Sequence, residues 1–277
     1  MQKVSNIIPY FRKELAGIFE DRELVSFAYL SIKYLLGYDL SDCIINSDKG
    51  ITREVSDKLK EIIVDLKTKK PLQYILGEAD FYGLKLKVNE HTLIPRPETE
   101  GLVDWILKED FESALDIGSG NGCIAVSLAK YSNANVYTMD VSKNALKVAE
   151  ENAILNNVKV TFIQQNILKT RILPKFDLIV SNPPYVVHSD KEEIDENVLN
   201  YEPHLALFVS DQDPLIFYRK IAELAFKSLN IKGKLFFEIN ERFGNEIVSI
   251  LDQMGFVDIE LKKDINDRDR MIKAICK

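Results

Sequence analysis

Short apolar segments alternate with helix-like segments from about residue 98 onward, and this alternation constrains the fold more than any other feature of the chain. The apolar segments have the length and composition of buried strands. They are Ala114–Ile117, Val136–Met139, Val160–Gln164, Phe176–Ser181, Lys234–Ile239, Val257–Lys262 and Met271–Cys276. Helical stretches such as Ser142–Asn152 and Pro214–Leu229 separate most of them. The pattern predicts a Rossmann-like α/β fold, with seven strands in a mostly parallel sheet and helices on both faces.

The connection between the last two candidate strands is the short polar loop Asp264–Asp269. A parallel crossover needs about a dozen residues or more, whereas a short loop joins antiparallel neighbours. We therefore predict that the final strand is antiparallel to the strand before it.

The first part of the chain, residues 1–70, has a different pattern. Apolar residues recur at three- and four-residue spacing in Leu24–Leu35 and again in Val55–Leu66. Gly37 is placed to cap the C-terminus of the first helix, and Thr52 to cap the N-terminus of the second. We predict a small N-terminal helical domain.

The pattern of apolar residues changes again between residues 71 and 97. Pro71 stops the helical pattern, Leu84–Val88 alternates with a period of two, and glycines stand on both sides of the Phe81-Tyr82 pair. These features predict a β-hairpin connector over 71–97, which leaves residues 98–277 as the domain that contains the large sheet.

The four residues Asn182-Pro183-Pro184-Tyr185 directly follow the candidate strand Phe176–Ser181. Two prolines cannot extend a strand, so they form a stiff loop at its carboxyl end, where open α/β sheets bind their ligands. The Asn182 side-chain oxygen and the Pro183 carbonyl can face one spot, and the Tyr185 ring offers a flat surface beside it. Two converging acceptors suit an NH₂ group, so the loop indicates chemistry on an amide or an exocyclic amine.

A glycine-rich loop follows the first candidate strand and precedes a helix. Its candidate cofactor-binding residues are Asp116, Gly118, Ser119, Gly120, Asn121 and Gly122, and Asn182 of the Asn-Pro-Pro-Tyr loop is a further candidate. The spacing Gly-x-Gly-x-Gly, rather than Gly-x-Gly-x-x-Gly, favours a cofactor without a pyrophosphate, such as S-adenosylmethionine. Asp116 can meet the amino group of that cofactor, and Asp140, at the end of the next strand, can accept both ribose hydroxyls. The loop alone leaves a nicotinamide cofactor or a structural turn open; the Asn-Pro-Pro-Tyr loop adds the argument for methyl transfer.

Composition excludes several classes of protein. No apolar run approaches the ~20 residues of a membrane span, and residues 1–6 lack the apolar core and small-residue cleavage site of a signal peptide, so we expect neither kind of segment. The three cysteines and three histidines have no metal-type spacing, so we expect no metal site, reduced thiols and a cytoplasmic protein. The net charge of −7 argues against nucleic acid as a direct partner.

The two loops, taken in this order, closely resemble those of the protein-(glutamine) methyltransferases that modify peptide chain release factors, the PrmC/HemK family. The resemblance spans roughly residues 70–277. Its further segments are Pro71–Gly77, Phe81–Gly83, Leu93–Glu100, Tyr201–Pro203, Ala206-Leu207 and Lys263–Arg270. It implies methyl transfer from S-adenosyl-L-methionine, leaving S-adenosyl-L-homocysteine, to the side-chain amide of the glutamine in the Gly-Gly-Gln motif of a release factor. Residues 98–277 are then the catalytic domain, and we expect the helical domain to dock the protein substrate.

The chain departs from the family's pattern at two places. Asn166, followed by Ile167, stands where an acidic residue commonly meets the adenine amine, so cofactor contacts are expected there from an amide instead. Asn240 stands at the end of the fifth strand where glycine is expected, which affects a local turn.

Several site residues have two interpretations. Tyr185 and Phe81 either sandwich the substrate amide or pack as ordinary aromatics. Arg96 and Glu98 either shape the substrate pocket or form a helix cap and a surface ion pair. Glu202 either contacts the substrate loop or lies in a solvated turn.

Two other functions compete with glutamine methylation. A nucleic-acid methyltransferase acting on the exocyclic amine of adenine or guanine would present the same acceptor geometry to a flipped base. A non-catalytic protein that binds S-adenosylmethionine would not need Asn182 and Pro183 beside the cofactor loop. We expect a monomeric enzyme in which Asn182, Pro183, Pro184 and Tyr185 form the catalytic loop and no general base is required.

Overall fold

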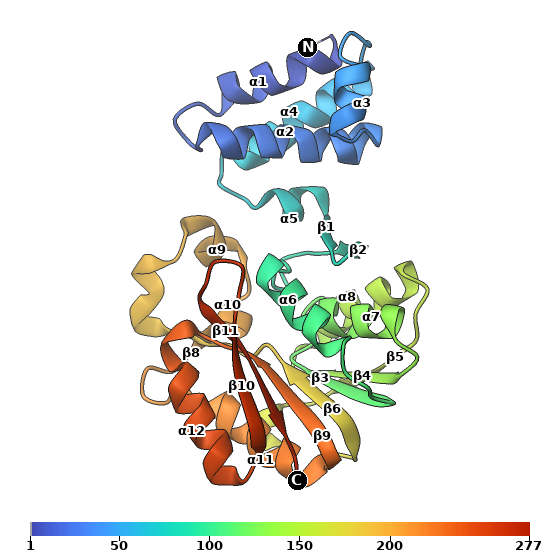
Figure 1. Ribbon diagram of the computed structural model, residues 1–277. Helices are drawn as coiled ribbons and strands as arrows, with labels where there is room; N and C mark the ends of the chain where they lie inside the picture. Colours follow the sequence, from blue (N-terminus) through green and yellow to red (C-terminus); the bar gives the residue numbers. More distant parts are fainter. Residues whose placement is uncertain (1) are drawn as a thin grey trace. The chain divides into compact units, whose positions relative to one another are not determined.

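The computed structural model describes residues 2–277, which divide into two compact units (Figure 1). The first unit contains the residues up to 77 together with 196–201, and the second contains 78–195 and 202–277. Each unit has its own hydrophobic core, so each is described by itself.

The first unit is helical. Its helices are η1 (Val4–Asn6), α1 (Ile7–Glu14), α2 (Asp21–Leu36), α3 (Leu40–Ile45), α4 (Arg53–Leu66), α5 (Leu72–Leu76) and α9 (Glu196–Tyr201). Both predicted caps are confirmed: Gly37 follows α2 in the left-handed conformation, and the Thr52 side chain accepts a hydrogen bond from the Val55 N–H at 3.2 Å. The core of the unit is the apolar face of α1, α2 and α4, with Phe11, Ala28 and Leu59 fully buried.

The segment after Pro71 differs from the prediction. The helix α4 ends at Leu66, before Pro71, and Pro71 occupies the N-cap position of a further helix, α5, which Gly77 ends in the left-handed conformation. The predicted hairpin therefore occupies only β1 (Glu78–Phe81) and β2 (Leu84–Lys87), which pair antiparallel around the turn at Tyr82 and Gly83.

The second unit is built on a seven-stranded sheet with the order β10-β11-β9-β6-β3-β4-β5. The strands are β3 (Ser113–Ile117), β4 (Asn135–Asp140), β5 (Val160–Gln164), β6 (Phe176–Ser181), β9 (Leu229–Glu238), β10 (Val257–Lys263) and β11 (Asp269–Ile275). The strands β9, β6, β3, β4 and β5 are parallel, and β11 is antiparallel to both of its neighbours. The predicted fold class and the antiparallel final strand are both confirmed.

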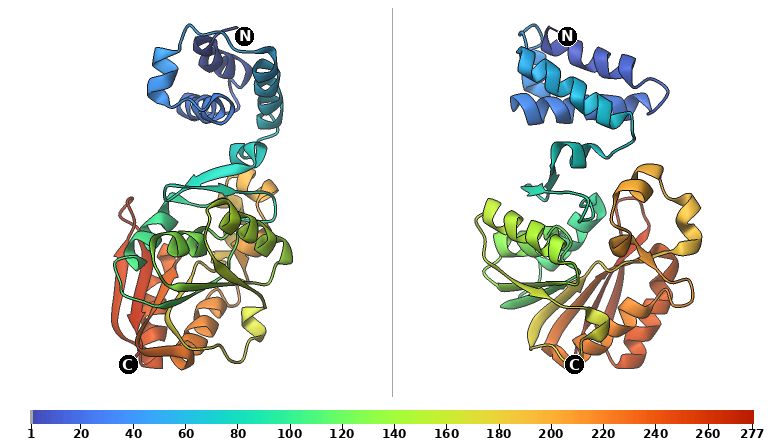
Figure 2. Two further views of the ribbon diagram at one scale, coloured as in Figure 1. Left: turned by 90° about the vertical axis from the view of Figure 1, so that its right-hand side faces the viewer. Right: turned by 180° about the vertical axis from the view of Figure 1, so that it is seen from behind.

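Helices cover both faces of this sheet (Figure 2). They are α6 (Pro97–Ile106), α7 (Cys123–Tyr131) and α8 (Lys143–Leu155) on one face, and α11 (Ile216–Ser228) and α12 (Gly244–Met254) on the other. Alternate residues of one strand enter different cores: Leu178 and Val180 pack with α6 and α7, whereas Ile179 packs with α11 and α12. Because both faces are covered, the central strands are continuously apolar, and this is why they were visible in the sequence.

The segment between β6 and α11 contains elements that the sequence did not predict. They are β7 (Val186–Val187), η3 (His188–Glu193), α9, α10 (His204–Leu207) and β8 (Phe208–Val209), with β7 and β8 paired parallel. Strands of two residues and helices of one or two turns carry no readable periodicity. The remaining short helices, η2 (Ile167–Lys169) and η4 (Glu241–Phe243), follow β5 and β9.

Candidate active site

A cavity of about 380 Å³ lies at the carboxyl ends of the parallel strands in the second unit. Its walls come from the loops after β3, β4, β5 and β6, from the connector after β2, and from the segment around α10. A cavity of this size at this edge of an open α/β sheet suits a small-molecule ligand.

Most of the predicted site residues meet in this cavity. The predicted residues that line it are Arg96, Gly118, Ser119, Gly120, Asn121, Asp140, Asn166, Ile167, Asn182, Pro183 and Pro184. The parallel strands place the glycine-rich loop and the Asn-Pro-Pro-Tyr loop side by side, because β3 and β6 are neighbours in the sheet.

The other predicted residues lie outside the cavity wall. Phe81 is 2% exposed and packs in the core between the sheet and α6, so it is an ordinary packing aromatic. Tyr185 packs against the opposite core, and Glu98 is half-buried in the first turn of α6. Asp116, in β3, and Gly122, the residue before α7, are both buried.

The glycine-rich loop is held by the strand beside it. The N–H groups of Gly118 and Ser119 both donate to the Met139 carbonyl, at 2.8 and 3.0 Å. Gly118 has a φ of +93°, and a Cβ at this position would stand 3.7 Å from the Asn182 carbonyl oxygen. A Cβ at this distance would make an ordinary contact, so it is the left-handed backbone, strained for other residues, that favours glycine here.

Asp116 is the most unusual group near the cavity. Its Oδ2 accepts a hydrogen bond from Thr138 Oγ1 at 2.9 Å, whereas its Oδ1 is buried without a partner. Burial raises the pKa of Asp116 to about 7, against the Thr138 hydrogen bond, which lowers it. The Ala125 backbone N–H also favours the charged form of Asp116, and a cationic ligand group in the adjoining cavity would do the same.

Asp140 and Asn166 meet the cavity with their side chains already engaged. Asp140 Oδ2 accepts from the Gly120 N–H at 3.0 Å and Oδ1 from the Ser142 N–H at 2.8 Å, while burial raises the pKa of this carboxyl. Asn166 Oδ1 accepts from the Leu168 N–H at 2.9 Å and so caps η2. Each of these oxygens keeps a lone pair that a ligand hydroxyl or amine can use.

The connector contributes more of the cavity wall than the one predicted residue, Arg96. Further lining residues are His91, Thr92, Leu93 and Pro95 from the connector, Thr99 from the first turn of α6, and Pro203, Leu205 and Ala206 from the segment around α10. Several of these residues fall within the family-like segments of the sequence, but their side chains carry no obvious chemistry, so spacing alone could not identify them.

Two buried side chains tie the connector in place. Asn121 Nδ2 donates to the Leu93 carbonyl at 2.8 Å. Asn152, fully buried on α8, bonds the backbone N–H and carbonyl of Lys87 and donates to the Asn121 carbonyl at 2.8 Å. The glycine-rich loop, β2 and α8 are therefore joined at one point.

Glu202 does not lie in a solvated turn, and its contact with a substrate loop stays a prediction. It is 4% exposed, its Oε1 lies 2.6 Å from Arg96 Nη2, and its Oε2 accepts from the Ile94 N–H at 3.1 Å. It therefore holds the connector and orients Arg96, which lines the cavity. Sequence spacing gives no signal for an ion pair between residues this far apart.

Two further properties concern the part of the chain that the structure describes. Within residues 2–277, no cluster of His, Cys, Asp and Glu side chains is arranged to hold a metal ion. Over the same residues, each helix is too short or too polar to span a bilayer.

Comparison with known proteins places the chain in a family. Residues 97–204 match the methyltransferase small domain, and residues 9–77 match the PrmC N-terminal domain. A release factor glutamine methyltransferase of Flavobacterium psychrophilum is 49% identical over 280 residues, which cover 98% of each chain. The chain belongs to the release factor glutamine methyltransferase family. The enzyme of the same name from Bacteroides thetaiotaomicron is 40% identical over 276 residues, covering 98% of this chain and 99% of that protein. A Pyrococcus furiosus methyltransferase of known structure shares the fold, with a TM-score of 0.54 and 21% identity over 79% of this chain and 98% of that one.

The residues of the cavity fit S-adenosyl-L-methionine, the methyl donor of release factor glutamine methyltransferases. Two buried polar atoms without a partner belong to the cofactor loop: the acceptor Asp116 Oδ1 and the hydroxyl Ser119 Oγ. An ammonium group and a carboxylate are the complementary partners, and the methionine end of this cofactor carries both. Asp140, at the end of β4, has the position expected for a ribose contact.

Proposed function

We propose that this protein transfers a methyl group from S-adenosyl-L-methionine to the side-chain amide nitrogen of the glutamine in the Gly-Gly-Gln motif of a peptide chain release factor. The observation that supports this most strongly is the side-by-side placement of Asn182 and Pro183 with the glycine-rich loop in one cavity. Relatives that match almost the whole chain carry this activity in their name.

The acceptor loop is fixed by its strand. Ser181 Oγ donates to the Ile117 carbonyl at 2.6 Å, which joins the ends of β6 and β3 directly before the two loops. Pro183 is buried and Asn182 half-buried, and two successive prolines restrict the backbone between Asn182 and Tyr185. The loop is therefore rigid before any substrate arrives.

The chemistry requires an amide nitrogen to become a nucleophile, although its lone pair is delocalised into the carbonyl. The Asn182 side-chain oxygen and the Pro183 carbonyl accept the two amide N–H bonds and aim the lone-pair face of the nitrogen at the donor methyl. These hydrogen bonds strengthen as positive charge develops on the nitrogen, so they stabilise the transition state more than the bound substrate. S-adenosyl-L-methionine supplies an electrophilic methyl group, and holding it in line with the nitrogen supplies much of the remaining rate.

The same acceptors select glutamine over glutamate. A carboxylate has no N–H to donate, so it would leave both acceptors unpaired and be repelled by them. Sites built on buried hydrogen bonds reject an analogue that lacks the donor by about 10⁴-fold or more. No side chain is needed to take up a proton, because a methylated amide cation is acidic enough to lose its proton to water.

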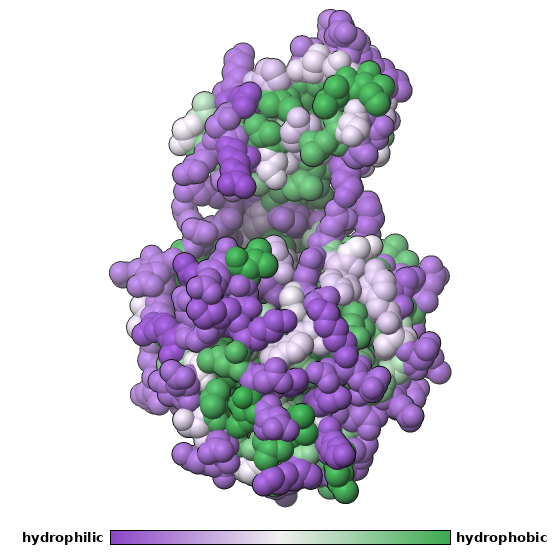
Figure 3. Space-filling model, in the orientation of Figure 1, coloured by the Kyte–Doolittle hydropathy of each residue, from purple (hydrophilic) through white to green (hydrophobic). Residues whose placement is uncertain are grey.

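We also propose that the helical unit docks the protein substrate. Its α3 helix exposes three large apolar side chains, Leu40, Ile44 and Ile45, and Figure 3 shows this hydrophobic surface. Ile44 and Ile45 are 74% and 79% exposed, which is unusual for neighbouring isoleucines on a monomeric surface. Replacing both with glutamate should raise the KM for a whole release factor about ten-fold or more and leave the Kd for the cofactor unchanged.

Three further aspects stay proposals: a monomeric state, a cytoplasmic location and the absence of a direct nucleic-acid partner. The three free cysteines and the net charge of −7 support the last two. The alternative activity, methylation of an exocyclic base amine, is not favoured, because the named relatives act on release factors.

A substitution in the acceptor loop tests the proposed chemistry. Asn182→Ala should lower kcat on a release factor about 100-fold or more, because one of the two transition-state hydrogen bonds is lost, and should change the cofactor Kd by no more than about three-fold. Unchanged turnover in this variant would show that Asn182 does not hold the amide. A release factor with glutamate in its Gly-Gly-Gln motif is the matched substrate control and should accept no methyl group.

A further inference from the structure

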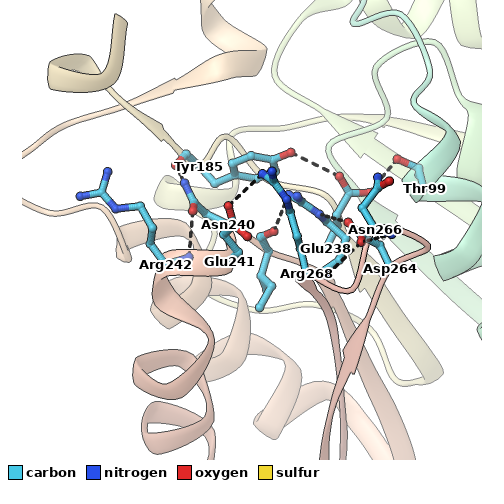
Figure 4. A network of polar contacts seen from close by, with 11 residues as sticks. Thr99, Tyr185, Glu238, Asn240, Glu241, Arg242, Asp264, Asn266 and Arg268 are labelled. Carbon is cyan, nitrogen blue, oxygen red and sulfur yellow. Dashed lines mark hydrogen bonds and ion pairs between the residues drawn. The ribbon is translucent and has the colours of Figure 1, made fainter. Parts of the chain in front are cut away.

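A buried carboxylate at the end of β9, Glu238, is the feature of the second unit that the reaction described above leaves unused. It is 1% exposed, and its two oxygens bind side chains from two other segments of the chain. Thr99 Oγ1, from the first turn of α6, donates to Oε2 at 2.6 Å. The Tyr185 hydroxyl, from the acceptor loop, donates to Oε1 at 3.4 Å. Figure 4 shows this network.

A second contact from the same end of β9 reaches the acceptor loop. Asn240 Nδ2 donates to the Tyr185 carbonyl at 3.3 Å, while Asn240 Oδ1 accepts from the Arg242 N–H at 3.0 Å and caps η4. Tyr185 is therefore bonded through its hydroxyl to Glu238 and through its backbone to Asn240. This is the position where the sequence has asparagine instead of glycine, and the exchange supplies a hydrogen bond to the loop that a glycine cannot make.

The hairpin formed by β10 and β11 provides a positive charge close to Glu238. Arg270 lies near Glu238 and favours its ionised form, against burial, which raises the pKa of this carboxyl. Arg270 is itself fixed, because its Nε bonds Asp264 Oδ2 at 3.1 Å and its Nη1 donates to the Ile239 carbonyl at 3.2 Å. Asp264 in turn accepts from the N–H groups of Asn266 and Arg268. The family-like segment 263–270 thus supports Glu238 instead of contacting the cavity.

We propose that Glu238 is a positioning residue for methyl transfer, which ties the acceptor loop to the first turn of α6 beside the cavity by holding the hydroxyls of Tyr185 and Thr99. Thr99 lines the cavity, and Tyr185 directly follows the prolines that line it. One buried carboxylate therefore joins the acceptor loop and the start of α6, two segments beside the cavity that come from different parts of the chain. The inference rests on the proposed function, because it assigns Glu238 to the placement of the Asn182 and Pro183 acceptors.

The test measures kcat and KM on a release factor and the cofactor Kd in a set of variants. Glu238→Ala should lower kcat about ten-fold or more, since the hydroxyls of Thr99 and Tyr185 both lose their acceptor, and should keep KM and Kd within about three-fold. Tyr185→Phe should lower kcat about five-fold, because its hydrogen bond to Glu238 is long. The double variant should be no slower than Glu238→Ala alone, because both changes break the same contact.

Glu238→Gln keeps an acceptor and a similar shape, so it should restore kcat to within about three-fold of the wild type. Asp177→Asn is the matched structural control. Asp177 is a hydrogen-bonded carboxylate at the other end of β6, where it bonds Ser113 and Asn230, and its loss should leave kcat unchanged. The proposal is overturned if the double variant shows the product of the two single-variant losses in kcat. It is also overturned if the cofactor Kd of a variant rises by as large a factor as its kcat falls.

Tyr185→Phe carries the test if Glu238→Ala does not fold, because removing one hydroxyl leaves the packing intact; an unchanged kcat then overturns the proposal. If the wild-type protein methylates no release factor, the proposed function fails separately. The position of the Tyr185 ring in crystals of Glu238→Gln and Tyr185→Phe then decides the inference. If the aromatic ring of residue 185 keeps its wild-type position in Glu238→Gln but not in Tyr185→Phe, Glu238 is its anchor. If the ring has the same position in both variants, the inference is overturned.

Discussion

The buried Asp116 carboxyl makes a quantitative prediction about stability and pH. Its pKa is about 7 in the folded protein, against an ordinary value of 3.8, because the side chain is desolvated. A raised acid pKa means that the folded state disfavours the charged form, so the contribution of this group to stability is complete below about pH 4 and is lost as the pH rises towards 7. At 1.36 kcal/mol per pH unit, the full loss is about 4 kcal/mol.

Asp116→Asn removes this titration and keeps an acceptor for Thr138. Relative to the variant, the wild-type apoprotein should therefore lose about 2.5 kcal/mol of unfolding free energy between pH 5 and pH 8. Urea unfolding followed by tryptophan fluorescence measures this loss. The one tryptophan, Trp105, lies in the core of the second unit and reports on that unit alone.

Binding of the cofactor should remove this loss of stability with rising pH. An ammonium group beside Asp116 Oδ1 stabilises the charged form, so saturating S-adenosyl-L-methionine should remove most of the pH dependence in the wild type and stabilise the variant much less. Equal slopes for the two apoproteins between pH 5 and pH 8 would refute the argument. Slopes that differ, but that cofactor leaves unchanged, would place the ammonium group elsewhere.

Two other substitutions test the packing that holds the site. Gly122→Ala should destabilise the second unit by about 2–5 kcal/mol in urea unfolding, because the residue has a φ of +81° and its Cβ would stand 2.9 Å from Ala149 Cβ. Gly120→Ala has open space around it and should cost only the backbone strain of about 1–2 kcal/mol. Equal losses of stability in the two variants would contradict the contact with Ala149. Glu202→Ala should lower the unfolding free energy by about 1–3 kcal/mol and raise the KM for a release factor, because Arg96 and the Ile94 N–H lose their partner. Glu202→Gln should recover most of the stability. Unchanged stability in Glu202→Ala would show that the ion pair does not hold the connector.

The sheet was predictable from sequence because its central strands are buried on both faces. Continuous apolar runs such as Phe176–Ser181 need no partner to be recognised, and the glycine-rich and proline-rich loops directly after them locate the cavity. Local signals also identified the caps at Gly37 and Thr52, since a cap depends on residues within one turn.

The contacts that shape the cavity were not predictable in the same way, because they join residues far apart in the chain. Glu202 reads as a turn residue until Arg96 and Ile94 are placed beside it. Asn240 suggested only a local turn, yet its side chain reaches the Tyr185 carbonyl. Phe81 carries an aromatic ring that suits either a substrate or a core, and only its burial under α6 distinguishes the two.

The most direct test of the account is mass spectrometry of a release factor incubated with this protein and S-adenosyl-L-methionine. We expect one added methyl group, mapped to the glutamine of the Gly-Gly-Gln motif, which the Asn182→Ala variant adds about 100-fold or more slowly. An unmodified release factor, with methyl groups on the adenine or guanine amines of nucleic acid in a parallel reaction, would contradict it.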